Sequence, residues 1–416
     1  RDGFLIAALF WSVLALFGSL PLMLTDVAPL SLTDAVFESF SGLTTTGATV
    51  ITGIEHLPES ILYYRQQLQW LGGMGIVVLA VAILPTLGVG GMALYRTEIP
   101  GPLKDSKLTP RITETAKALW YIYAALTITC MLAYMAAGMN WFDALGHSFS
   151  TVAIGGFSTY DASIGHFDSA LIEMICVFFL IVSAVSFSLH FVAWRQRSVT
   201  HYFQDPEARF LLLFLLGLVV ITVVSLWLTE TYGTERGLRH GLFQVVSVAT
   251  TAGFGVADFS LWPGALPFLL FMAAFVGGCS GSTGGGMKVI RIILILKQGM
   301  REVMRLIHPN AVIAVKVGKV SVPDGIAQAV WGFFSVYVML FFLMLVGVMA
   351  TGVDQVTAWS TVASALNNLG PALGEASGHY GDLPTLAKWI LVVAMLLGRL
   401  EIFTVLVLFT PAFWRR

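Results

Sequence analysis

Four segments of the chain share an arrangement of residue types that could bind a cation through backbone oxygens. In each, a short run able to form a helix is followed by a tight turn on a glycine, and the pair lies between two long apolar segments. The segments align without gaps on these glycines, with a small residue twelve positions earlier and a serine six positions earlier. The glycines are Gly47, Gly156, Gly253 and Gly370; the small residues are Ala35, Ala144, Gly241 and Ala358; the serines are Ser41, Ser150, Ser247 and Ser364.

The residues that enter each glycine are small or polar, and they share no charge and no set of metal-binding side chains. They are Thr44, Thr45, Thr46 and Gly47; Ala153, Ile154, Gly155 and Gly156; Thr250, Thr251, Ala252 and Gly253; and Asn367, Asn368, Leu369 and Gly370. Glycine permits backbone angles that a side chain would forbid, and extended backbone can direct carbonyl oxygens inward to replace the hydration shell of a monovalent cation. A helix that ends at the turn adds partial negative charge. We therefore expect cation filters at 44–48, 153–157, 250–254 and 367–371.

Composition identifies the solvent around these turns. Apolar residues make up 57% of the chain and charged residues only 11%, which a single soluble domain could not accommodate. A helix needs roughly 20 residues to cross a bilayer core, and eight stretches are long enough: 4–24, 61–84, 117–138, 169–193, 209–229, 263–296, 327–350 and 385–411. Irregular backbone at membrane depth is tolerated only inside protein or beside a water-filled path. The sequence thus predicts an integral membrane protein whose turns line such a path.

Successive pairs of spans enclose one turn each, and a period this long indicates fourfold internal duplication rather than a solenoid. We expect an all-α integral membrane protein with four parallel repeats, each made of a span, a pore helix, a filter and a span, around a pseudo-fourfold pore. The predicted repeats are 1–95; 96–208, which includes a cytoplasmic linker; 209–319, which includes a broken sixth span and a second cytoplasmic linker; and 320–416.

Charges are distributed unevenly between the two faces that this topology defines. The 23 Lys and Arg residues fall on the linker side except for Arg65, Arg236, Arg239 and Lys388 on the turn side and Arg399 within a span. The positive-inside rule therefore places the linkers in the cytoplasm. Most Asp and Glu residues lie on the turn side, where they could concentrate cations at an outer mouth. The alternative is weaker selection on loop charge during insertion.

Several motifs along the chain resemble those of a known family. They are Trp70 to Gly75, Thr44 to Ala48, Thr250 to Gly255, Gly277 to Gly286 with Lys288, and Asn367 to Pro371. Together they resemble the Trk/Ktr/HKT superfamily of potassium transporters, most closely its bacterial TrkH branch, and the resemblance extends over essentially the whole chain.

The resemblance implies a homodimeric subunit of the bacterial inner membrane in which each protomer holds its own pore, with the filter side toward the periplasm. It implies potassium ions at the filters, without an organic cofactor or nucleic acid, and glycine at all four anchor positions favours potassium over sodium. It also implies regulation by a cytosolic ring of nucleotide-binding subunits of the TrkA type. Members of that branch usually have two further helices before the first repeat, so we do not expect residue 1 to be the native start.

The predicted sixth span is interrupted by a glycine-rich stretch that a stable helix interior would not contain. It comprises Gly277, Gly278, Cys279, Ser280, Gly281, Ser282, Thr283, Gly284, Gly285 and Gly286. Small residues of this kind could allow close helix packing, whereas the resemblance implies a movable gate beneath the filter, with Lys288 directly after it. A nucleotide-binding P-loop is not favoured, because no Gly-Lys-Ser/Thr is present.

Two arginines on predicted spans have open roles. Arg399 would lie in the middle of the last span, and Glu401, two residues later, points in another direction on a helix. Arg399 could form an ion pair with another helix, or, as the resemblance implies, face the conduction path as an electrostatic barrier. Arg65, near the outer end of the second span, could anchor packing or donate hydrogen bonds to filter carbonyls.

The linkers 96–117 and 288–319 are basic and contain prolines, which favours short surface helices in contact with anionic lipid. The resemblance adds that these linkers dock the regulatory ring. Two functions follow for the chain: a channel-like potassium-permeation subunit, or a proton- or sodium-coupled potassium symporter with broken helices at the midplane. An enzyme is not expected, because the 8 His and 3 Cys form no metal motif and no catalytic triad or carboxylate pair is recognisable.

Overall fold

Four short, buried helices end at the four predicted turns. In the computed structural model, which describes residues 2–27, 29–82, 112–318 and 320–414, they are α3 (Leu32–Leu43), α8 (Trp141–Val152), α13 (Thr234–Ala249) and α17 (Gln355–Asn367). Three of them begin at a side chain that accepts a backbone N–H of the first turn, namely Ser31, Asn140 and Asp354. The predicted short helix before each anchor glycine is therefore present in every case.

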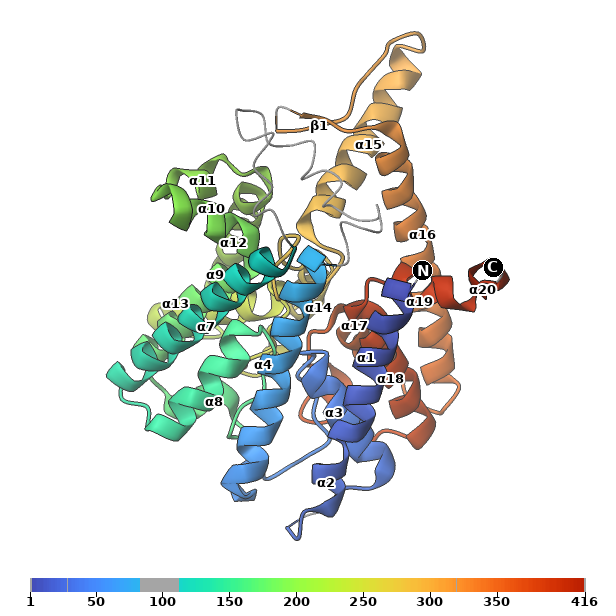
Figure 1. Cartoon of the computed structure of the whole chain (residues 1–416). Coiled ribbons are helices and arrows are strands. Elements are labelled where there is room, and N and C mark those ends of the chain that lie inside the picture. The colour runs from blue at the N-terminus through green and yellow to red at the C-terminus, as the bar shows by residue number, and fades with distance from the viewer. Residues whose placement is uncertain (1, 28, 83–111, 319, 415–416) are drawn as a thin grey trace.

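Longer helices precede and follow each short helix (Figure 1). Those that precede are α1 (Asp2–Gly18), extended by α2 (Leu20–Leu24), α7 (Ile112–Ala136), α12 (Pro206–Leu228) and α16 (Asp324–Met349). Those that follow are α4 (Glu59–Ala82), α9 (Ala170–Ala184) with α10 (Phe187–Gln196), α14 (Leu266–Ala274) with α15 (Val289–Ile307), and α18 (Thr385–Arg399) with α19 (Phe403–Leu406). The shorter elements are α11 (Thr200–Gln204), α20 (Pro411–Trp414) and 3-10 turns at Ile54–His56, Ser163–Phe167, Phe259–Leu261, Gly374–Ala376 and Val407–Phe409.

The described residues contain four helices that are long and apolar enough to cross a membrane, and six such spans if α9–α10 and α18–α19 are each counted as one bent span. The other two predicted spans, 61–84 and 263–296, do not meet that criterion. The first half of α4 carries Arg65 and several glutamines, and the second range is divided between α14 and α15. The total of eight spans remains a prediction. Helix α4 is compatible with it, because its 24 residues are long enough to cross a hydrocarbon core of about 30 Å.

The short helices pack in a closed ring against the helices that follow the preceding turn. Helix α8 packs on α4, α13 on α9, α17 on α14, and α3 on α18. The last of these contacts joins the two ends of the chain, and an ion pair of 2.6 Å between Lys388 Nζ and Asp34 Oδ1 strengthens it. Helix α1 also contacts α19 (Figure 1). The chain therefore encircles the four turns.

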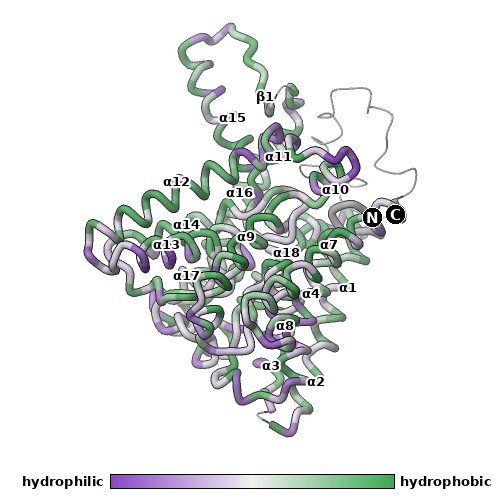
Figure 2. Tube along the Cα trace, turned by 90° about the vertical axis from the view of Figure 1, so that its left-hand side faces the viewer, coloured by the Kyte–Doolittle hydropathy of each residue, from purple (hydrophilic) through white to green (hydrophobic). Residues whose placement is uncertain are grey.

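Apolar side chains cover the outside of this ring as well as its interior. Along α12, Leu211 and Leu215 are buried, whereas Leu213 and Leu216 are 64% and 60% exposed. Figure 2 shows hydrophobic residues along most of α12, and hydrophilic residues gathered at the tip beyond α15 and at the opposite end of the molecule near α2. A helix that is apolar all round on an outer surface is suited to contact with lipid.

Two predicted spans are bent where the sequence predicted continuous helices. Helices α9 and α10 meet at 93°, and α18 and α19 meet at 105°. At the first bend Val185 is extended, and the Phe187 N–H donates to the Gly281 carbonyl at 3.1 Å. At the second bend Glu401 and Ile402 have φ of 57° and 46°. Arg399 is consequently the last residue of α18, not a residue in the middle of a straight span.

Helices α15 and α16 project from the bundle and carry a small hairpin (Figure 1). Its strands are β1 (Lys316–Val317) and β2 (Val320–Ser321), which pair antiparallel. The prediction of short surface helices in 288–319 is wrong, because Val289–Ile307 forms a single 19-residue helix. No proline interrupts that run before Pro309, so nothing ends the helix earlier. The linker residues 96–111 lie outside the described residues.

Candidate functional site

All four short helices end in the same hydrogen-bonded motif. The residue two positions before the anchor glycine has a positive φ: 52° at Thr45, 54° at Ile154, 69° at Thr251 and 53° at Asn368. The N–H of the residue after it donates to the carbonyl of the recurring serine, at 2.8 Å for Ser41, Ser150 and Ser247 and 2.9 Å for Ser364. This is the Schellman arrangement, in which a left-handed residue ends a helix and satisfies its last carbonyls. The recurring serine thus contributes its backbone to the turn.

The anchor glycines pack against one another's turns in a ring. Each has a φ in the left-handed region, 82° at Gly47, 80° at Gly156 and Gly253, and 102° at Gly370. A Cβ on any of these glycines would collide with a carbonyl oxygen of the next turn. The distances would be 2.1 Å from Gly47 to Gly155, 2.0 Å from Gly156 to Ala252, 2.1 Å from Gly253 to Leu369 and 2.7 Å from Gly370 to Thr46. Both the backbone angle and the space therefore require glycine.

The predicted filter residues all lie in this ring, and all are buried apart from the half-buried Gly47, Gly156, Gly253 and Pro371. None of them is charged, so carbonyl oxygens and helix C-terminal ends dominate the local electrostatics. In the described part of the chain, no group of three or more His, Cys, Asp or Glu side chains could hold a metal ion. The arrangement can offer backbone oxygen ligands to a monovalent cation.

The predicted gate residues 277–286 form an irregular loop between α14 and α15, directly against the turns. The loop donates three hydrogen bonds to them: Thr283 Oγ1 to the Val152 carbonyl at 2.9 Å, the Gly285 N–H to Thr251 Oγ1 at 2.6 Å, and the Gly286 N–H to the Asn367 carbonyl at 3.0 Å. A Cβ on Gly285 would lie 2.0 Å from the Asn367 oxygen. The glycines thus allow backbone to press against the ends of three short helices.

The loop is also tied to the surrounding long helices. The Cys279 N–H donates to the Ala184 carbonyl at 2.8 Å, and the Ser280 N–H donates to Glu207 Oε2 at 2.8 Å. The Lys288 ammonium donates to the Gly284 carbonyl within the loop. Because these bonds reach α9 and α12, the loop is a fully anchored element rather than only a close-packing site for helices.

Arg399 lies against the same loop with most of its guanidinium unsatisfied. Its side chain is 4% exposed, and Nη1 donates to the Thr283 carbonyl at 2.9 Å. Nε and Nη2 are buried without a hydrogen-bond partner, and Arg399 forms no ion pair with any described residue. Glu401 pairs instead with Arg291, at 2.5 Å between Oε2 and Nη2. The sequence left two roles open for Arg399. The first, an ion pair with another helix, is not found among the described residues.

Comparison with known proteins assigns the chain to a family. The family model TrkH, described as cation transport protein, matches residues 1–416. The chain belongs to the TrkH family. It is 88% identical over 416 residues to the Trk system potassium uptake protein TrkH of Halomonas elongata, and 56% identical to the protein of the same name from Escherichia coli; both matches cover 100% of this chain and 86% of the relative. The TrkH family is one of transporters, not enzymes.

The fold agrees with a solved member of the TrkH family. The crystal structure of the potassium transporter TrkH from Vibrio parahaemolyticus superimposes with a TM-score of 0.93 at 54% identity, and the match covers 100% of this chain and 86% of that chain. The predicted all-α membrane architecture and the predicted family are thereby confirmed.

Two polar side chains of this TrkH-family chain donate to carbonyls of the predicted filters and were not predicted as site residues. Gln69 Nε2 donates to the Gly155 carbonyl at 2.6 Å, and its Oε1 accepts the Phe157 N–H at 3.1 Å, so the amide brackets Gly156. Tyr380 Oη donates to the Gly370 carbonyl at 2.8 Å. The available signal for Gln69 was its place in a cluster of polar residues on a predicted span, and nothing in the sequence connected Tyr380 to Gly370.

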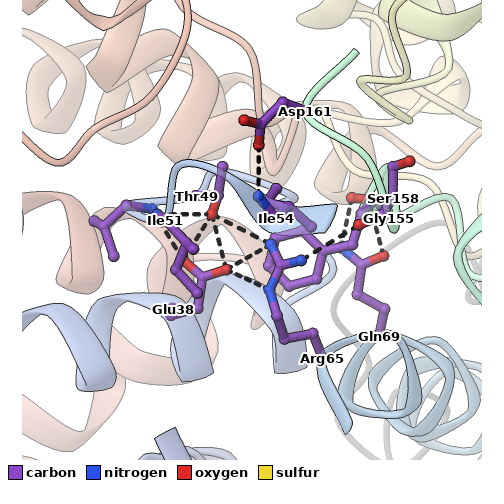
Figure 3. Close-up of polar contacts among 11 residues, drawn as sticks. Glu38, Thr49, Ile51, Ile54, Arg65, Gln69, Gly155, Ser158 and Asp161 are labelled. Carbon is purple, nitrogen blue, oxygen red and sulfur yellow. Dashed lines mark hydrogen bonds and ion pairs between the residues drawn. The ribbon is translucent and has the colours of Figure 1, made fainter. Parts of the chain in front are cut away.

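Arg65 forms a buried ion pair behind the first two turns (Figure 3). Its side chain is 1% exposed and that of Glu38 is 0% exposed, and Nη2 lies 2.7 Å from Glu38 Oε1. Thr49 Oγ1 accepts from Arg65 Nη2 at 3.2 Å and donates to Glu38 Oε1 at 2.9 Å. Arg65 Nη1 donates to the Ser158 carbonyl at 3.3 Å, just beyond the predicted filter. Arg65 therefore acts as a packing anchor in this TrkH-family chain, and the carbonyl to which it donates belongs to Ser158, not to a predicted filter residue.

Several acids expected at the outer mouth are engaged locally. Asp161 accepts the Gly53 N–H at 2.7 Å and the Ile54 N–H at 3.1 Å (Figure 3). Backbone N–H groups of Glu55 itself and of Asp161 hold the pKa of the Glu55 carboxyl below its ordinary value. Since Asp34, Glu38 and Glu173 also pair with cations, any attraction of ions by acids in this TrkH-family chain would depend on the remaining exposed carboxylates.

Replacing Gln69 by leucine should destabilise the folded protein by about 1–3 kcal/mol, because the Gly155 carbonyl and the Phe157 N–H lose a partner while staying buried. Thermal unfolding in detergent, followed by intrinsic fluorescence, measures the effect. Gln67→Leu is the matched control, since Gln67 is half-buried on the same helix and forms no hydrogen bond with a described residue. Equal thermal unfolding midpoints for the two variants would show that Gln69 does not stabilise the turn.

Replacing Arg65 by glutamine should destabilise the protein by about 3–5 kcal/mol, because Glu38 is left charged and unpaired in the interior. The double variant Glu38→Gln/Arg65→Gln should lose less than the sum of the two single variants. Thermal midpoints of all three variants, with the exposed Arg236→Gln as control, measure the coupling. Strict additivity would show that the two side chains act independently.

Proposed function

We propose that this chain is the ion-permeation subunit of a bacterial potassium uptake system and that it works as a channel-like pore. The observation that carries the proposal is the ring in which each anchor glycine packs against a carbonyl of the next turn. Backbone carbonyls gathered in this way can replace the hydration shell of a dehydrated cation. Potassium is supported by the relatives, which are named potassium uptake proteins and a potassium transporter.

Potassium is the substrate of this pathway. It would exchange water for carbonyl oxygens at 44–48, 153–157, 250–254 and 367–371, and would then meet the loop 277–286. We assign this loop and Lys288 to a gate, because the loop is bonded to three turns and must leave them for an ion to pass. Arg399 adds an electrostatic barrier, which its unpaired guanidinium nitrogens support. A buried charge without a partner is strongly unfavourable for folding, so we assign Arg399 a role in transport rather than in stability.

We further propose that the chain forms a homodimer in the bacterial inner membrane with its turns toward the periplasm. The distribution of Lys and Arg supports this orientation. A cytosolic nucleotide-binding ring of the TrkA type would dock on the linker side, where α15, β1, β2 and α16 project from the bundle and offer a separate surface (Figure 1).

A proton- or sodium-coupled potassium symporter is the second candidate. The observation that favours it is a cavity of about 30 Å³ behind the loop, bordered by Lys288, Arg291, Arg399 and Glu401. Ionisable groups at membrane depth can relay protons. The cavity brings Lys288 and Arg291 close to Arg399 and Glu401, so four such groups are available rather than two. Three of the four are cationic, however, and would oppose occupation by a second cation, so we place the channel first.

Rubidium uptake into proteoliposomes that contain this chain alone, at a set membrane potential, distinguishes the two candidates. For a channel, uptake should follow the potential, should be blocked by potassium far better than by sodium, and should not require a proton or sodium gradient. Gly156→Ala should abolish uptake, because its Cβ would overlap the Ala252 carbonyl oxygen. Gly217→Ala on α12 is the control, since nothing lies within 4 Å of a Cβ there. Uptake that depends on a second gradient would make the chain a symporter.

Replacing Arg399 by glutamine should raise rubidium flux by about tenfold or more. A unit charge on the order of 8 Å from the ion path opposes a cation by roughly 2 kcal/mol at an effective dielectric constant of about 20. Initial uptake rates of the variant, normalised to reconstituted protein, provide the comparison, with Arg305→Gln on the exposed part of α15 as a control of equal charge. Unchanged flux in an Arg399→Gln variant that elutes as the parent protein does would contradict the barrier.

A further inference from the structure

An apolar groove with a basic rim lies between α7 and the α10–α11 segment, away from the four turns. Its volume is about 920 Å³, within the range of sites that bind small molecules. Helix α7 contributes Ile122, Ala125 and Leu126 to its wall, and the opposite side contributes Val182 and Ala193. A groove of this kind on the outside of a membrane protein faces lipid.

The bend between α9 and α10 creates the groove. Helix α10 leaves the direction of α9 at 93° and packs against α7, so the groove lies in the angle between these helices. The polar groups at the bend satisfy one another: His190 Nε2 donates to the Val182 carbonyl at 2.9 Å, and Tyr202 Oη donates to His190 Nδ1 at 2.8 Å. The wall therefore presents apolar surface and needs no polar ligand inside the groove.

The rim of the groove carries two exposed cations. Lys117 and Arg197 both line it and are exposed, and neither forms an ion pair with a residue that the structure describes. The apolar stretch of α7 begins at Thr115, so Lys117 lies at the membrane-surface end of that helix. Trp194 and Val199, which are 73% and 70% exposed, flank the same rim. Basic and aromatic side chains together are typical of the level of lipid headgroups.

We propose that this groove binds one anionic phospholipid, with an acyl chain along the apolar wall and the phosphate between Lys117 and Arg197. Charge complementarity selects this occupant: two exposed cations, neither of them in an ion pair with a described residue, match at the mouth of an apolar groove a molecule with one anionic head and a long apolar tail. A zwitterionic lipid would leave the rim with excess positive charge. The inference does not depend on which ion the chain transports.

Native mass spectrometry of the full chain in mild detergent, titrated with phosphatidylglycerol or with phosphatidylcholine of the same acyl chains, tests the proposal. Phosphatidylglycerol should remain bound and phosphatidylcholine should not. Removing one basic residue near an anionic headgroup lowers binding by roughly fivefold, so Lys117→Gln/Arg197→Gln should lower retention by more than about tenfold. Arg195→Gln is the matched control, since Arg195 is also exposed on α10 but does not line the groove.

A second pair of variants tests the apolar part of the site. Ala125→Trp should fill the groove and abolish retention, whereas Ile128→Trp, at a residue that is 59% exposed and outside the groove, should not. Equal retention of the two lipids, an equal loss in Arg195→Gln, or full retention in Ala125→Trp would each overturn the proposal. If a second copy of the chain covers the groove, no added lipid should bind, and an Ala125→Cys variant should be protected from thiol labelling only in the dimer. That result would also overturn the proposal.

Discussion

Backbone groups buried at membrane depth must find partners without water, and the four turns meet this constraint by closing on one another. Each short helix satisfies its last carbonyls through a left-handed residue, and each anchor glycine lets the next turn approach to a distance that any side chain would prevent. The remaining parts of the site serve that arrangement. Gln69 and Tyr380 donate to carbonyls of the turns, and the loop 277–286 supplies its own donors to the ends of three helices.

The interior contains charges in two opposite situations. Glu38 and Arg65 neutralise each other, and Thr49, Val50 and Ser158 supply further hydrogen bonds, so the pair fixes the packing of α3 against α4. Among the described residues, Arg399 has a single acceptor, the Thr283 carbonyl, and two of its nitrogens have no partner. The Glu38–Arg65 ion pair stabilises the packing of helices, whereas the positive charge of Arg399 repels any other cation nearby.

The parts of this structure that depend on local sequence could be predicted. The short helices and their glycines follow from apolar spans, a capping residue and a position that only glycine can occupy, and the broken span follows from its glycines. Long-range features could not be predicted. Neither valine nor glutamate is a residue type that indicates a bend in a helix, so the bends at Val185 and Glu401 could not be predicted. The first bend is held by a contact with Gly281 and the second by the ion pair with Arg291. Tyr380 reaches Gly370 only because the intervening turn folds back. The left-handed Thr45, Ile154, Thr251 and Asn368 were unexpected, since such positions usually carry glycine.

The closure of the ring between the two ends of the chain has a consequence for biosynthesis. Lys388 and Asp34 are separated by 354 positions, and the first turn meets the last through Thr46 and Gly370. Contacts of such long range form late, after more local ones. While the ribosome is still producing the final helices, the first turn therefore has one open side within the bilayer. The first of the four short helices to be synthesised is thus the last to complete its packing, and assembly of the central ring begins and ends at α3.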